Sequence, residues 1–448
     1  MLWVLYNMVF AAGYGALLPG YLLRMKRRGG YRAHFRQRFG LYEPEVREAL
    51  GAAARIWLHG VSVGETYVTL RFAEELRAID PTARFVLSTT TSTGYRIASD
   101  NLADGDVLLY YPTDFPLFVK RALDTIRPRA LILAESELWP NMIRACFKRD
   151  VPVALVNGLI SDSAFRGYRR VSFLTARVLP LMRRFLVQTG TAAERLRALG
   201  APDERISVVG TAKYDMTGTP AQAGQRAAAL LEESGMDPRA CIIVGGSTWD
   251  GEEAALLRVY QRLAASRDDV RLVLVPRHME RRGEVEAELR RLRVAYVKRS
   301  DVQHARMRPR PGSTRVLLVD TTGELKDLYA GASVVFVGKS LTQTGGHNVI
   351  EPALFGKPIV VGPHLENFPI VAGDFRAADA LCEVRGEEAL FGALETLCGS
   401  EAARRTYGER AARVVAEKRG VVARSVAELQ ACMPGLVQAD GGAAGKQA

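Results

Sequence analysis

From residue 50 onward, the chain alternates between two patterns of apolar residues. Short runs rich in β-branched residues predict strands, and longer runs with an apolar residue every three or four positions predict helices. The first strand is predicted at Ile56–Leu58, and a helix follows from about Thr66 to Ile79, where Pro81 stops it. The same pattern predicts further strands at Phe85–Leu87, Val107–Tyr110, Ala130–Leu133, Val153–Val156 and Phe185–Val187. Such alternation favours a parallel, doubly wound sheet.

A second series of the same kind begins after a loose stretch of Gly, Thr, Pro and Ala residues at 217–224. Its strands are predicted at Cys241–Val244, Arg271–Val275, Val316–Val319, Val334–Val337, Pro358–Val361 and Leu381–Val384. Its helices are predicted near Asp250–Ala264, Glu280–Leu292, Gly323–Ala330 and His347–Phe355. We therefore predict an α/β fold with two domains, residues 25–216 and 217–432, and a disordered tail at 433–448. Ligands in this architecture bind in a cleft that the carboxyl ends of both sheets line.

The N-terminal segment differs from the rest of the chain. Leu2–Leu23 is a run of 22 uncharged, mostly apolar residues, and about 20 such residues suffice for a helix to cross a bilayer. A basic run follows it, at Arg24, Lys26, Arg27, Arg28, Arg32, Arg36 and Arg38. Because basic residues favour the cytoplasmic side, we predict a single-pass anchor at residues 1–24, with the rest of the chain in the cytoplasm and the basic run at anionic headgroups. The alternative is a buried hydrophobic helix followed by a solvated basic turn.

Composition narrows the class of partner. The chain has 448 residues, of which 48% are hydrophobic and 25% charged, and these values are typical of an ordered globular protein. A formal net charge of +12 favours anionic partners. No zinc-finger spacing, RNA-binding aromatic signature or helix-turn-helix pattern is present, so we expect no nucleic-acid partner. The five cysteines are scattered, without a CxxC pair, which indicates reduced thiols.

Two loops of the first domain carry acidic residues at the carboxyl ends of predicted strands. Glu65 lies at the start of the first long helix, where a carboxylate is either a helix cap or a general base for a sugar hydroxyl. Glu135 and Glu137 share the second loop, just before a helix with Pro140 in its first turn. Capping explains one of these two carboxylates, and the other requires a partner, which we expect to be basic.

A lysine and four segments of the second domain complete the candidate residues. Lys213, near the domain boundary, is either solvent-exposed or able to neutralise a phosphate or a carboxylate. The Gly246-Ser247 segment follows a strand, as in loops that bind phosphate through backbone N–H groups. The other candidates, which also follow strands, are Pro276, Arg277, His278, Thr322, Gly323, Glu324, Asn348, Val349, Ile350 and Glu351. The sequence contains no P-loop lysine and no GxGxxG motif, and we expect neither a cofactor nor a catalytic metal.

The last of these segments has two interpretations. Gly345-Gly346 followed directly by a helix start forms an anion site, because the first N–H groups of a helix are unpaired. Asn348 and Glu351 share one helix face and suit a nucleotide sugar. The other interpretation is a helix cap with a buried carboxylate.

Together, these segments resemble the 3-deoxy-D-manno-octulosonic acid (Kdo) transferases of Gram-negative bacteria. The resemblance covers nearly the whole chain, and its motifs occur in the expected order. They are HGVSVGE (59–65), AESELWP (134–140), GTAKYD (210–215), GGST (245–248), PRH (276–278), TGEL (322–325) and GGHNVIEPALFGKPIVVGPHLENF (345–368). It implies the GT-B fold, with two Rossmann-like domains. It also implies transfer of Kdo from CMP-Kdo to the glucosamine disaccharide lipid A precursor (lipid IVA) at the cytoplasmic face of the inner membrane, with release of CMP.

The resemblance also implies roles for individual residues. Glu65 matches the general base, and Glu135 and Lys213 match residues that stabilise the transition state. The segments 276–277, 322–324 and 348–351 match the CMP contacts, although Val349 stands where the family often has proline. Two alternatives remain open on the residues alone: a membrane-associated GT-B transferase that uses a UDP-sugar, and a nucleotide-sugar-binding protein without turnover.

Overall fold

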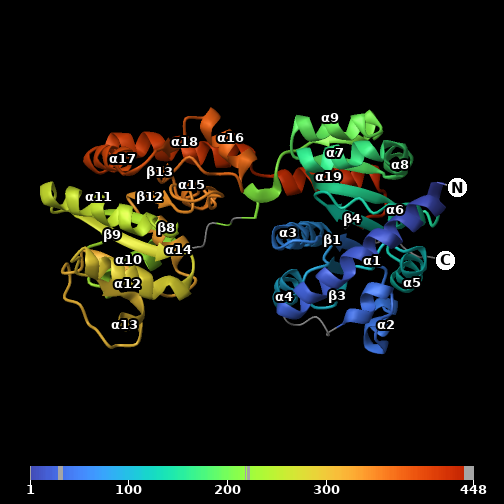
Figure 1. Cartoon of the computed structure of the whole chain (residues 1–448), viewed down its shortest axis with the longest axis horizontal. Helices are drawn as coiled ribbons and strands as arrows, with labels where there is room; N and C mark the ends of the chain where they lie inside the picture. Colours follow the sequence, from blue (N-terminus) through green and yellow to red (C-terminus); the bar gives the residue numbers. More distant parts are fainter. Residues whose placement is uncertain (1, 29–33, 217, 219–221, 438–448) are drawn as a thin grey trace, which may run out of the picture. The chain divides into compact units, whose positions relative to one another are not determined.

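The computed structural model describes residues 2–28, 34–216, 218 and 222–437, and it divides into two compact units (Figure 1). Unit 1 comprises Met1–Met216 with Gly420–Ala448, and unit 2 comprises Thr217–Arg419. Of the tail predicted to be disordered, 433–448, the residues 438–448 lie outside the described residues, as do Arg32 of the basic run and positions 217 and 219–221 of the loose stretch at 217–224. The prediction was wrong for 433–437, because Met433 and Leu436 are buried in the core of unit 1.

Seven described strands of unit 1 form one parallel sheet, in the order β3-β2-β1-β4-β5-β6-β7. The strands are β1 (Ile56–His59), β2 (Phe85–Thr89), β3 (Val107–Tyr110), β4 (Ala130–Ala134), β5 (Val153–Gly158), β6 (Arg184–Val187) and β7 (Ile206–Val208). The order runs in opposite directions on the two sides of the β1–β4 pair. This pair is therefore the topological switch point, where ligands of such sheets bind.

Helices connect these strands, as expected for right-handed crossovers between parallel strands. Those of unit 1 are α1 (Leu2–Arg28), α2 (Pro44–Gly51), α3 (Val63–Ile79), α4 (Ser92–Asp100), α5 (Pro116–Ile126), α6 (Pro140–Phe147), α7 (Asp162–Arg170), α8 (Ser172–Val178), α9 (Gly190–Ala198) and α19 (Val421–Cys432). Short 3₁₀ turns lie at Phe35–Phe39, Leu179–Leu181, Asp203–Arg205 and Ala212–Tyr214.

Unit 2 repeats the architecture with a parallel sheet in the order β10-β11-β9-β8-β12-β13-β14, among the residues described. Its strands are β8 (Cys241–Thr248), β9 (Val270–Pro276), β10 (Val297–Lys298), β11 (Val316–Leu318), β12 (Val334–Val337), β13 (Ile359–Val361) and β14 (Cys382–Glu383). Its helices are α10 (Ala223–Glu233), α11 (Glu252–Ser266), α12 (Arg282–Arg291), α13 (Arg299–Gln303), α14 (Leu325–Gly331), α15 (Ile350–Ala353), α16 (Pro369–Ala377), α17 (Glu387–Gly399) and α18 (Glu401–Lys418), with a 3₁₀ turn at Met279–Arg281. The switch point is the β8–β12 pair.

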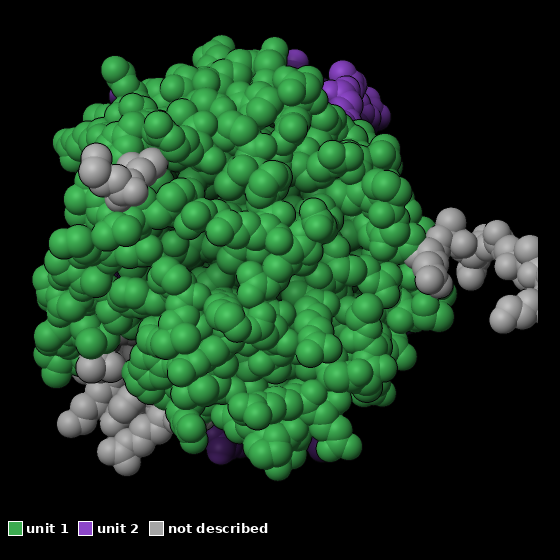
Figure 2. Space-filling view, turned by 90° about the vertical axis from the view of Figure 1, so that its right-hand side faces the viewer, with its two compact units in different colours: residues 1–216, 420–448 green, residues 217–419 purple. Residues whose placement is uncertain are grey.

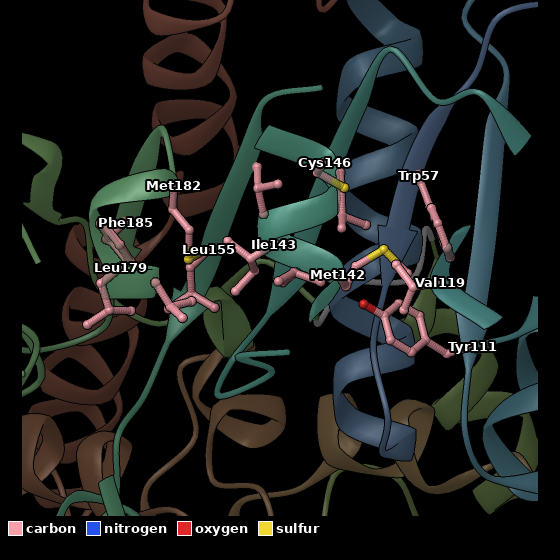
Figure 3. Packing of buried hydrophobic residues seen from close by; sticks show 14 of the residues in the cluster. Trp57, Tyr111, Val119, Met142, Ile143, Cys146, Leu155, Leu179, Met182 and Phe185 are labelled. Atoms are coloured by element: carbon pink, nitrogen blue, oxygen red, sulfur yellow. The ribbon is translucent and has the colours of Figure 1, made fainter. Parts of the chain in front are cut away.

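Both faces of the unit 1 sheet are covered, and its central strands are buried throughout. One face packs Trp57, Leu155 and Phe185 against Met142 and Ile143 of α6, as Figure 3 shows. This arrangement explains the uninterrupted apolar strands in the sequence, because a parallel sheet with helices on both faces has no polar side. The two-domain α/β prediction is thus confirmed at the level of fold.

The grouping of α19 differs from the predicted division, which placed residues up to 432 in the second domain. The chain returns to unit 1 after Arg419, and the Asp215 carboxylate accepts hydrogen bonds from the N–H groups of Gly420 and Val422, at 2.7 Å each. Val422 and Leu429 are then buried in the unit 1 core beside α3. Hydrophobic periodicity finds such a helix but cannot show against which sheet it packs.

The predicted N-terminal helix is present as α1, yet no helix in the described part of the chain is long and apolar enough to cross a membrane. The transmembrane span predicted for residues 1–24 is therefore not supported. Asn7, three glycines and Pro19 interrupt the apolar run and lower its mean hydropathy. One side of α1 instead contacts unit 1, where Trp3 and Tyr6 pack against the core.

Candidate functional site

The loops after β1 and β4 form an acidic candidate site within unit 1, at the switch point of its sheet. The two strands pair in register, with His59 beside Leu133. The chain therefore leaves both strands at the same edge of the sheet, and the residues that follow are Glu65 on one side and Glu135 and Glu137 on the other.

Glu65 is 8% exposed and lies in the first turn of α3. Its N–H donates to Ser62 Oγ (3.2 Å), so Ser62 caps the helix, and its Oε2 accepts the N–H of Val61 (2.8 Å), the residue before that cap. Gly60 is required beside it, because a Cβ there would lie 2.9 Å from the backbone of Glu65. The cap of α3 is therefore Ser62 and not Glu65, whose carboxylate is held in place by the loop before the helix.

Glu135 has a backbone conformation that is uncommon for its residue type. Its φ is 60°, in the left-handed region, and holding a residue there costs on the order of 1–3 kcal/mol. The Glu135 N–H donates to Val156 O (3.0 Å), and the Asn157 Nδ2 donates to Glu135 Oε1 (3.4 Å). Strand β5 thus supports this conformation and directs the side chain.

Electrostatics show that the two acidic loops and Lys213 lie together. Burial raises the pKa of Glu135 to about 7, the charge of Glu65 adds to the shift, and Lys213 opposes it. Burial lowers the pKa of Lys213, and Glu135 opposes that change. The structure therefore brings the three predicted catalytic residues, Glu65, Glu135 and Lys213, into one cluster.

Glu137 is the third carboxylate of the cluster. Burial raises its pKa to about 7, and Glu65 and Glu135 contribute in the same direction, while its Oε2 accepts the Trp139 indole N–H (2.9 Å). The same oxygen lies 3.9 Å from Nε2 of His59. Burial lowers the pKa of His59 to about 3, so the ring is neutral.

The expectation that Glu135 or Glu137 caps the following helix was wrong. The first N–H groups of α6, on Asn141 and Met142, donate to the buried carboxylate of Asp114, at 2.9 and 2.8 Å. Asp114 comes from the loop after β3, and nothing in the local sequence links it to α6. Neither loop carboxylate therefore caps α6.

Asn157 is a site residue that the sequence interpretation missed. It lies at the end of β5 with a φ of 50°, and its Oδ1 accepts the N–H of Ala212 (3.0 Å). Since its Nδ2 contacts Glu135, the side chain connects the acidic loop to the segment that carries Lys213. The Asn-Gly pair at the end of an apolar strand could have indicated a residue with a left-handed backbone at this position.

A second candidate site, which is basic, lies in unit 2 after β9 and β12. Arg277 and His278 directly follow β9, and the His278 ring contacts the edge of Trp249 (centroids 5.2 Å apart). Lys339 Nζ lies 4.5 Å above the same indole, and the Trp249 Nε1–H donates to Nε2 of His347 (3.0 Å). Burial, Arg277 and Lys339 together lower the pKa of His347 to about 4.

The Gly246-Ser247 segment is not the open phosphate loop that the sequence suggested. Strand β8 continues through it to Thr248, and the space beside Gly246 is filled by the Tyr329 hydroxyl, which would lie 2.2 Å from an added Cβ. The nearby N–H groups are also taken. Four of them donate to the buried carboxylate of Glu252 at 2.8–2.9 Å, from Trp249, Lys339, Ser340 and Leu341.

The segment 322–324 lies before α14, with Thr322 and Gly323 exposed. Glu324 accepts hydrogen bonds from Arg299 Nε (3.0 Å) and Gln303 Nε2 (3.1 Å). Its carboxylate is thus already paired within the unit, which leaves the exposed backbone of this segment as the part that faces solvent.

The segment 348–351 contains the helix cap and the buried carboxylate of the second interpretation, and the same two residues are those that the first interpretation assigns to a nucleotide sugar. The Asn348 Oδ1 caps the short helix α15 by accepting the N–H of Ile350 (3.0 Å), while Val349 and Ile350 are buried in the core. Glu351 is largely buried, which raises its pKa against the opposing effects of Lys326, Asn348 and Arg277. The predicted helix at His347–Phe355 is shorter as a result, because the cap starts it at Ile350.

Comparison with known proteins places these features in a family. The family model described as "3-Deoxy-D-manno-octulosonic-acid transferase (kdotransferase)" matches residues 33–216. The 3-deoxy-D-manno-octulosonic acid transferase of Bordetella pertussis is 33% identical over 399 residues, covering 87% of this chain and 90% of the relative. The enzyme of the same name from Haemophilus influenzae is 28% identical over 395 residues, covering 88% and 90%. The chain belongs to the Kdo transferase family.

A Kdo transferase is a glycosyltransferase, and the fold agrees with that class. The structure of Anabaena HepE, solved with UDP, matches with a TM-score of 0.55 at 12% identity, covering 85% of this chain and 100% of that one. At this identity the match concerns the fold alone, and it supports two parallel-sheet α/β units of the GT-B type. Since Kdo transferases are enzymes, membership of this family contradicts the alternative of a nucleotide-sugar-binding protein without turnover.

Proposed function

We propose that the protein transfers Kdo from CMP-Kdo to the glucosamine disaccharide lipid A precursor (lipid IVA), releasing CMP, in lipopolysaccharide biosynthesis. The observation that carries this proposal is the cluster of Glu65, Glu135, Glu137 and Lys213 at the switch point of the unit 1 sheet. Buried carboxylates beside one amine suit proton removal from a hydroxyl and stabilisation of developing charge.

Glu65 acts as the general base in this proposal. Its Oε2 is held by the Val61 N–H, which leaves Oε1 to take the proton of the acceptor hydroxyl. The hydroxyl oxygen forms a bond to the anomeric carbon of Kdo as the bond from that carbon to the phosphate oxygen breaks. CMP leaves with the electron pair, so no enzyme nucleophile and no metal are needed.

Glu135 and Lys213 stabilise the transition state. The Glu135 carboxylate stabilises the positive charge that develops at the anomeric carbon, and the Lys213 ammonium stabilises the negative charge on the departing phosphate. Burial raises the pKa of Glu135 to about 7, so its carboxylate is mostly ionised, and able to stabilise positive charge, only above neutral pH. Asn157 positions both residues through its two side-chain hydrogen bonds, to Glu135 Oε1 and to the Ala212 N–H.

Unit 2 binds CMP-Kdo through Arg277, the backbone of 322–324 and the segment 348–351 in this proposal. Support comes from the positive charge at this end of the sheet, where Arg277 acts on both His347 and Glu351, Lys339 acts on His347, and Lys326 acts on Glu351. Glu351 is the one carboxylate among them, and it suits the ribose hydroxyls of the nucleotide. Ser247 and His278 flank this cluster and are secondary contacts.

The acceptor is a phosphorylated lipid, so we propose that the protein works at an anionic membrane surface, the cytoplasmic face of the inner membrane. The net charge of +12 and the basic run after residue 23 support this location.

Replacing the proposed base tests the assignment directly. We expect Glu65→Gln to lower turnover by about 10²–10⁴-fold, the usual contribution of a general base, and to leave CMP affinity unchanged. Release of CMP and calorimetric CMP binding are the two measurements.

Glu48→Gln is the matched control, since Glu48 is an exposed glutamate on α2 of the same unit. Turnover of E65Q at the level of E48Q would remove Glu65 as the base. Loss of CMP binding in E65Q would show instead that its role is structural. Stabilisation by UDP in place of CMP would favour the UDP-sugar alternative.

A further inference from the structure

The amino-terminal edge of the unit 1 sheet contains a cavity of about 460 Å³, where β4, β5 and β6 begin. The chain that lines it comes from the end of α6, the segments before β5 and β6, and the residues 432–436 at the end of α19. Figure 2 views unit 1 from the side on which α5, α6 and α8 lie. The acidic cluster follows the carboxyl ends of β1 and β4, so the cavity and the cluster occupy opposite edges of one sheet.

Three arginines line this cavity, which we name the arginine cavity: Arg129, Arg183 and Arg205. Arg183 Nε and Arg129 Nη1 donate to carbonyl oxygens of the segment 432–436, at 2.8 and 3.4 Å. Arg205 Nη1 donates to two carbonyl oxygens of the segment 180–182, at 2.8 Å each. A guanidinium has five N–H groups, so these bonds hold each arginine in position and leave donors for a ligand.

The three arginines differ from neighbouring arginines, which have acidic partners. Arg184 forms an ion pair with Glu428 (2.5 Å), and Arg149 forms one with Asp124 (2.9 Å). None of the three arginines forms an ion pair with a described residue of the chain. Asp150 is the one carboxylate among the lining residues, so three arginines and one aspartate give the lining a net charge of +2. Guanidinium groups fixed around one cavity without acidic partners indicate a site for an anion with more than one charge.

The arginine cavity also has an apolar wall. Phe147, the last residue of α6, is 55% exposed, and Pro152, Leu181 and Met182 belong to the same lining. An exposed aromatic ring can stack on a planar ligand. The volume lies within the range of small-ligand sites, about 300–1,000 Å³. The lining therefore suits a ligand that combines phosphate groups with a flat ring.

We propose that the arginine cavity binds a nucleotide, with its phosphate groups at the three arginines and its base against the Phe147 ring. Three guanidinium groups exceed the charge of one phosphate, so a nucleoside diphosphate fits the site better than a monophosphate. Strands β4 and β5 lead from the cavity to Glu135 and Asn157. The nucleotide site is thus separate from the acidic cluster, and it does not depend on the function proposed above.

Cys432 reports on occupancy because it is half-buried and lines the cavity. ADP is the probe, since it carries two phosphate groups and a planar base. At about ten times its dissociation constant, ADP should slow the alkylation of Cys432 by iodoacetamide about tenfold, because the thiol reacts only in the empty site. Cys382, a half-buried thiol of unit 2, is the internal control and should react at the same rate with and without ADP. Mass spectrometry of the two peptides measures both rates.

Arg183→Gln tests whether the arginines bind the phosphate groups. Burial raises the pKa of Cys432, and the charges of Arg184 and Arg183 oppose that shift, so alkylation rates are compared with and without ADP within each variant. Loss of one charge-assisted contact should weaken ADP binding about tenfold or more. Arg177→Gln is the matched control, because Arg177 is an exposed arginine of the same unit that donates to one backbone carbonyl, at 2.8 Å, and lies outside the cavity.

Inorganic pyrophosphate and adenosine test the two halves of the site separately. Each should need a concentration about tenfold or more above that of ADP to protect Cys432, because each makes only one of the two kinds of contact. Equal protection by pyrophosphate and ADP would show an anion site without a place for the base and would overturn the proposal. Unchanged reactivity of Cys432 in ADP, or equal protection of R183Q and the wild type, would overturn it as well.

Calorimetric CMP binding distinguishes this site from the donor site proposed in unit 2. CMP affinity should be equal in R183Q and the wild type. A lower affinity in R183Q would show that the cavity is not a separate site and would contradict the proposal. A wild-type chain that fails to bind CMP, yet is protected at Cys432 by ADP, would count against the proposed function and leave the nucleotide site intact.

Discussion

At the scale of single residues, the cluster around Glu65 contains charges and backbone conformations that destabilise the fold, at the place where we propose that the reaction occurs. Two of its carboxylates have pKa values raised to about 7, and Glu135 has a left-handed backbone as well. Natural proteins retain such features where the charge or the geometry is used, at the expense of stability.

The loss of stability caused by the buried Glu135 carboxylate can be measured as a change in the free energy of unfolding. Burial and Glu65 raise its folded-state pKa to about 7, above the unfolded value of 4.5. A carboxylic acid with a raised folded pKa destabilises the fold once the pH exceeds its unfolded pKa, and the cost is complete above about pH 7. We expect Glu135→Gln to be more stable than wild type near pH 8 by on the order of 1–3 kcal/mol, and equally stable near pH 4. Urea unfolding at the two pH values measures the difference, and a constant difference would contradict the assignment.

His347 offers a second prediction at this scale. An indole N–H can only donate, so Nε2 of His347 must accept and its proton must be on Nδ1. Because its pKa is lowered to about 4, this neutral tautomer should persist through neutral pH. Nitrogen chemical shifts of His347 between about pH 5 and pH 8 should stay constant in the wild type. Titration near the ordinary histidine pKa of about 6.5 would contradict the hydrogen bond.

The sequence could predict which residues end up near the chemistry, because strand ends are visible as breaks in apolar runs. Glu65, Glu135 and Lys213 could be placed together on that basis. It could not predict which partner each carboxylate has. Asp114 caps α6 from 27 residues away, and Asn157 orients Glu135 from a neighbouring strand, contacts that depend on tertiary structure alone.

At the scale of elements, the strands predicted from apolar runs are present, and the strands that were not predicted are short. β7 and β10 have three and two residues and lie at sheet edges, where partial exposure breaks the apolar pattern. The end of β8 was misread for a different reason. Gly246-Ser247 was predicted to be a phosphate-binding loop after the strand, but Gly245 and Gly246 make room inside the sheet for Leu256 and the Tyr329 hydroxyl.

Glu252 holds the loop after β12 in place, and replacing it should show how far the stability of the protein depends on this carboxylate. Its carboxylate accepts four backbone N–H groups, whereas a glutamine has one acceptor oxygen and an NH₂ that meets other donors. We expect Glu252→Gln to lower the free energy of unfolding by about 3 kcal/mol and to weaken CMP binding through Lys339 and His347. Glu284→Gln, on the exposed side of α12, is the control. Unchanged stability in E252Q would show that the loop does not depend on this carboxylate.

At the scale of the whole molecule, the chain passes from unit 1 to unit 2 and then back to unit 1. Helix α19, in the segment that returns, forms part of the core of unit 1. Val422, Val426 and Leu429 of α19 are buried beside α3, and each such side chain contributes about 1.5–3 kcal/mol. Truncation after Arg419 should therefore destabilise unit 1 by several kcal/mol or prevent its folding.

Thermal unfolding is the measurement, and truncation after Val437, which retains α19, is the control. Native stability of unit 1 in the shorter chain would contradict the grouping of α19 with that unit. Sequence periodicity could not reveal this crossing, because an amphipathic helix fits either of two similar α/β sheets equally well.

The central claim is that this chain moves Kdo from CMP-Kdo onto a lipid A precursor. Mass spectrometry of the lipid after incubation of the full chain with CMP-Kdo and the tetra-acylated disaccharide tests it most directly. The account predicts a product heavier than the acceptor by one or more Kdo residues, formed together with CMP and absent with Glu65→Gln. An unmodified acceptor with the wild-type chain, or equal product with E65Q, would contradict it.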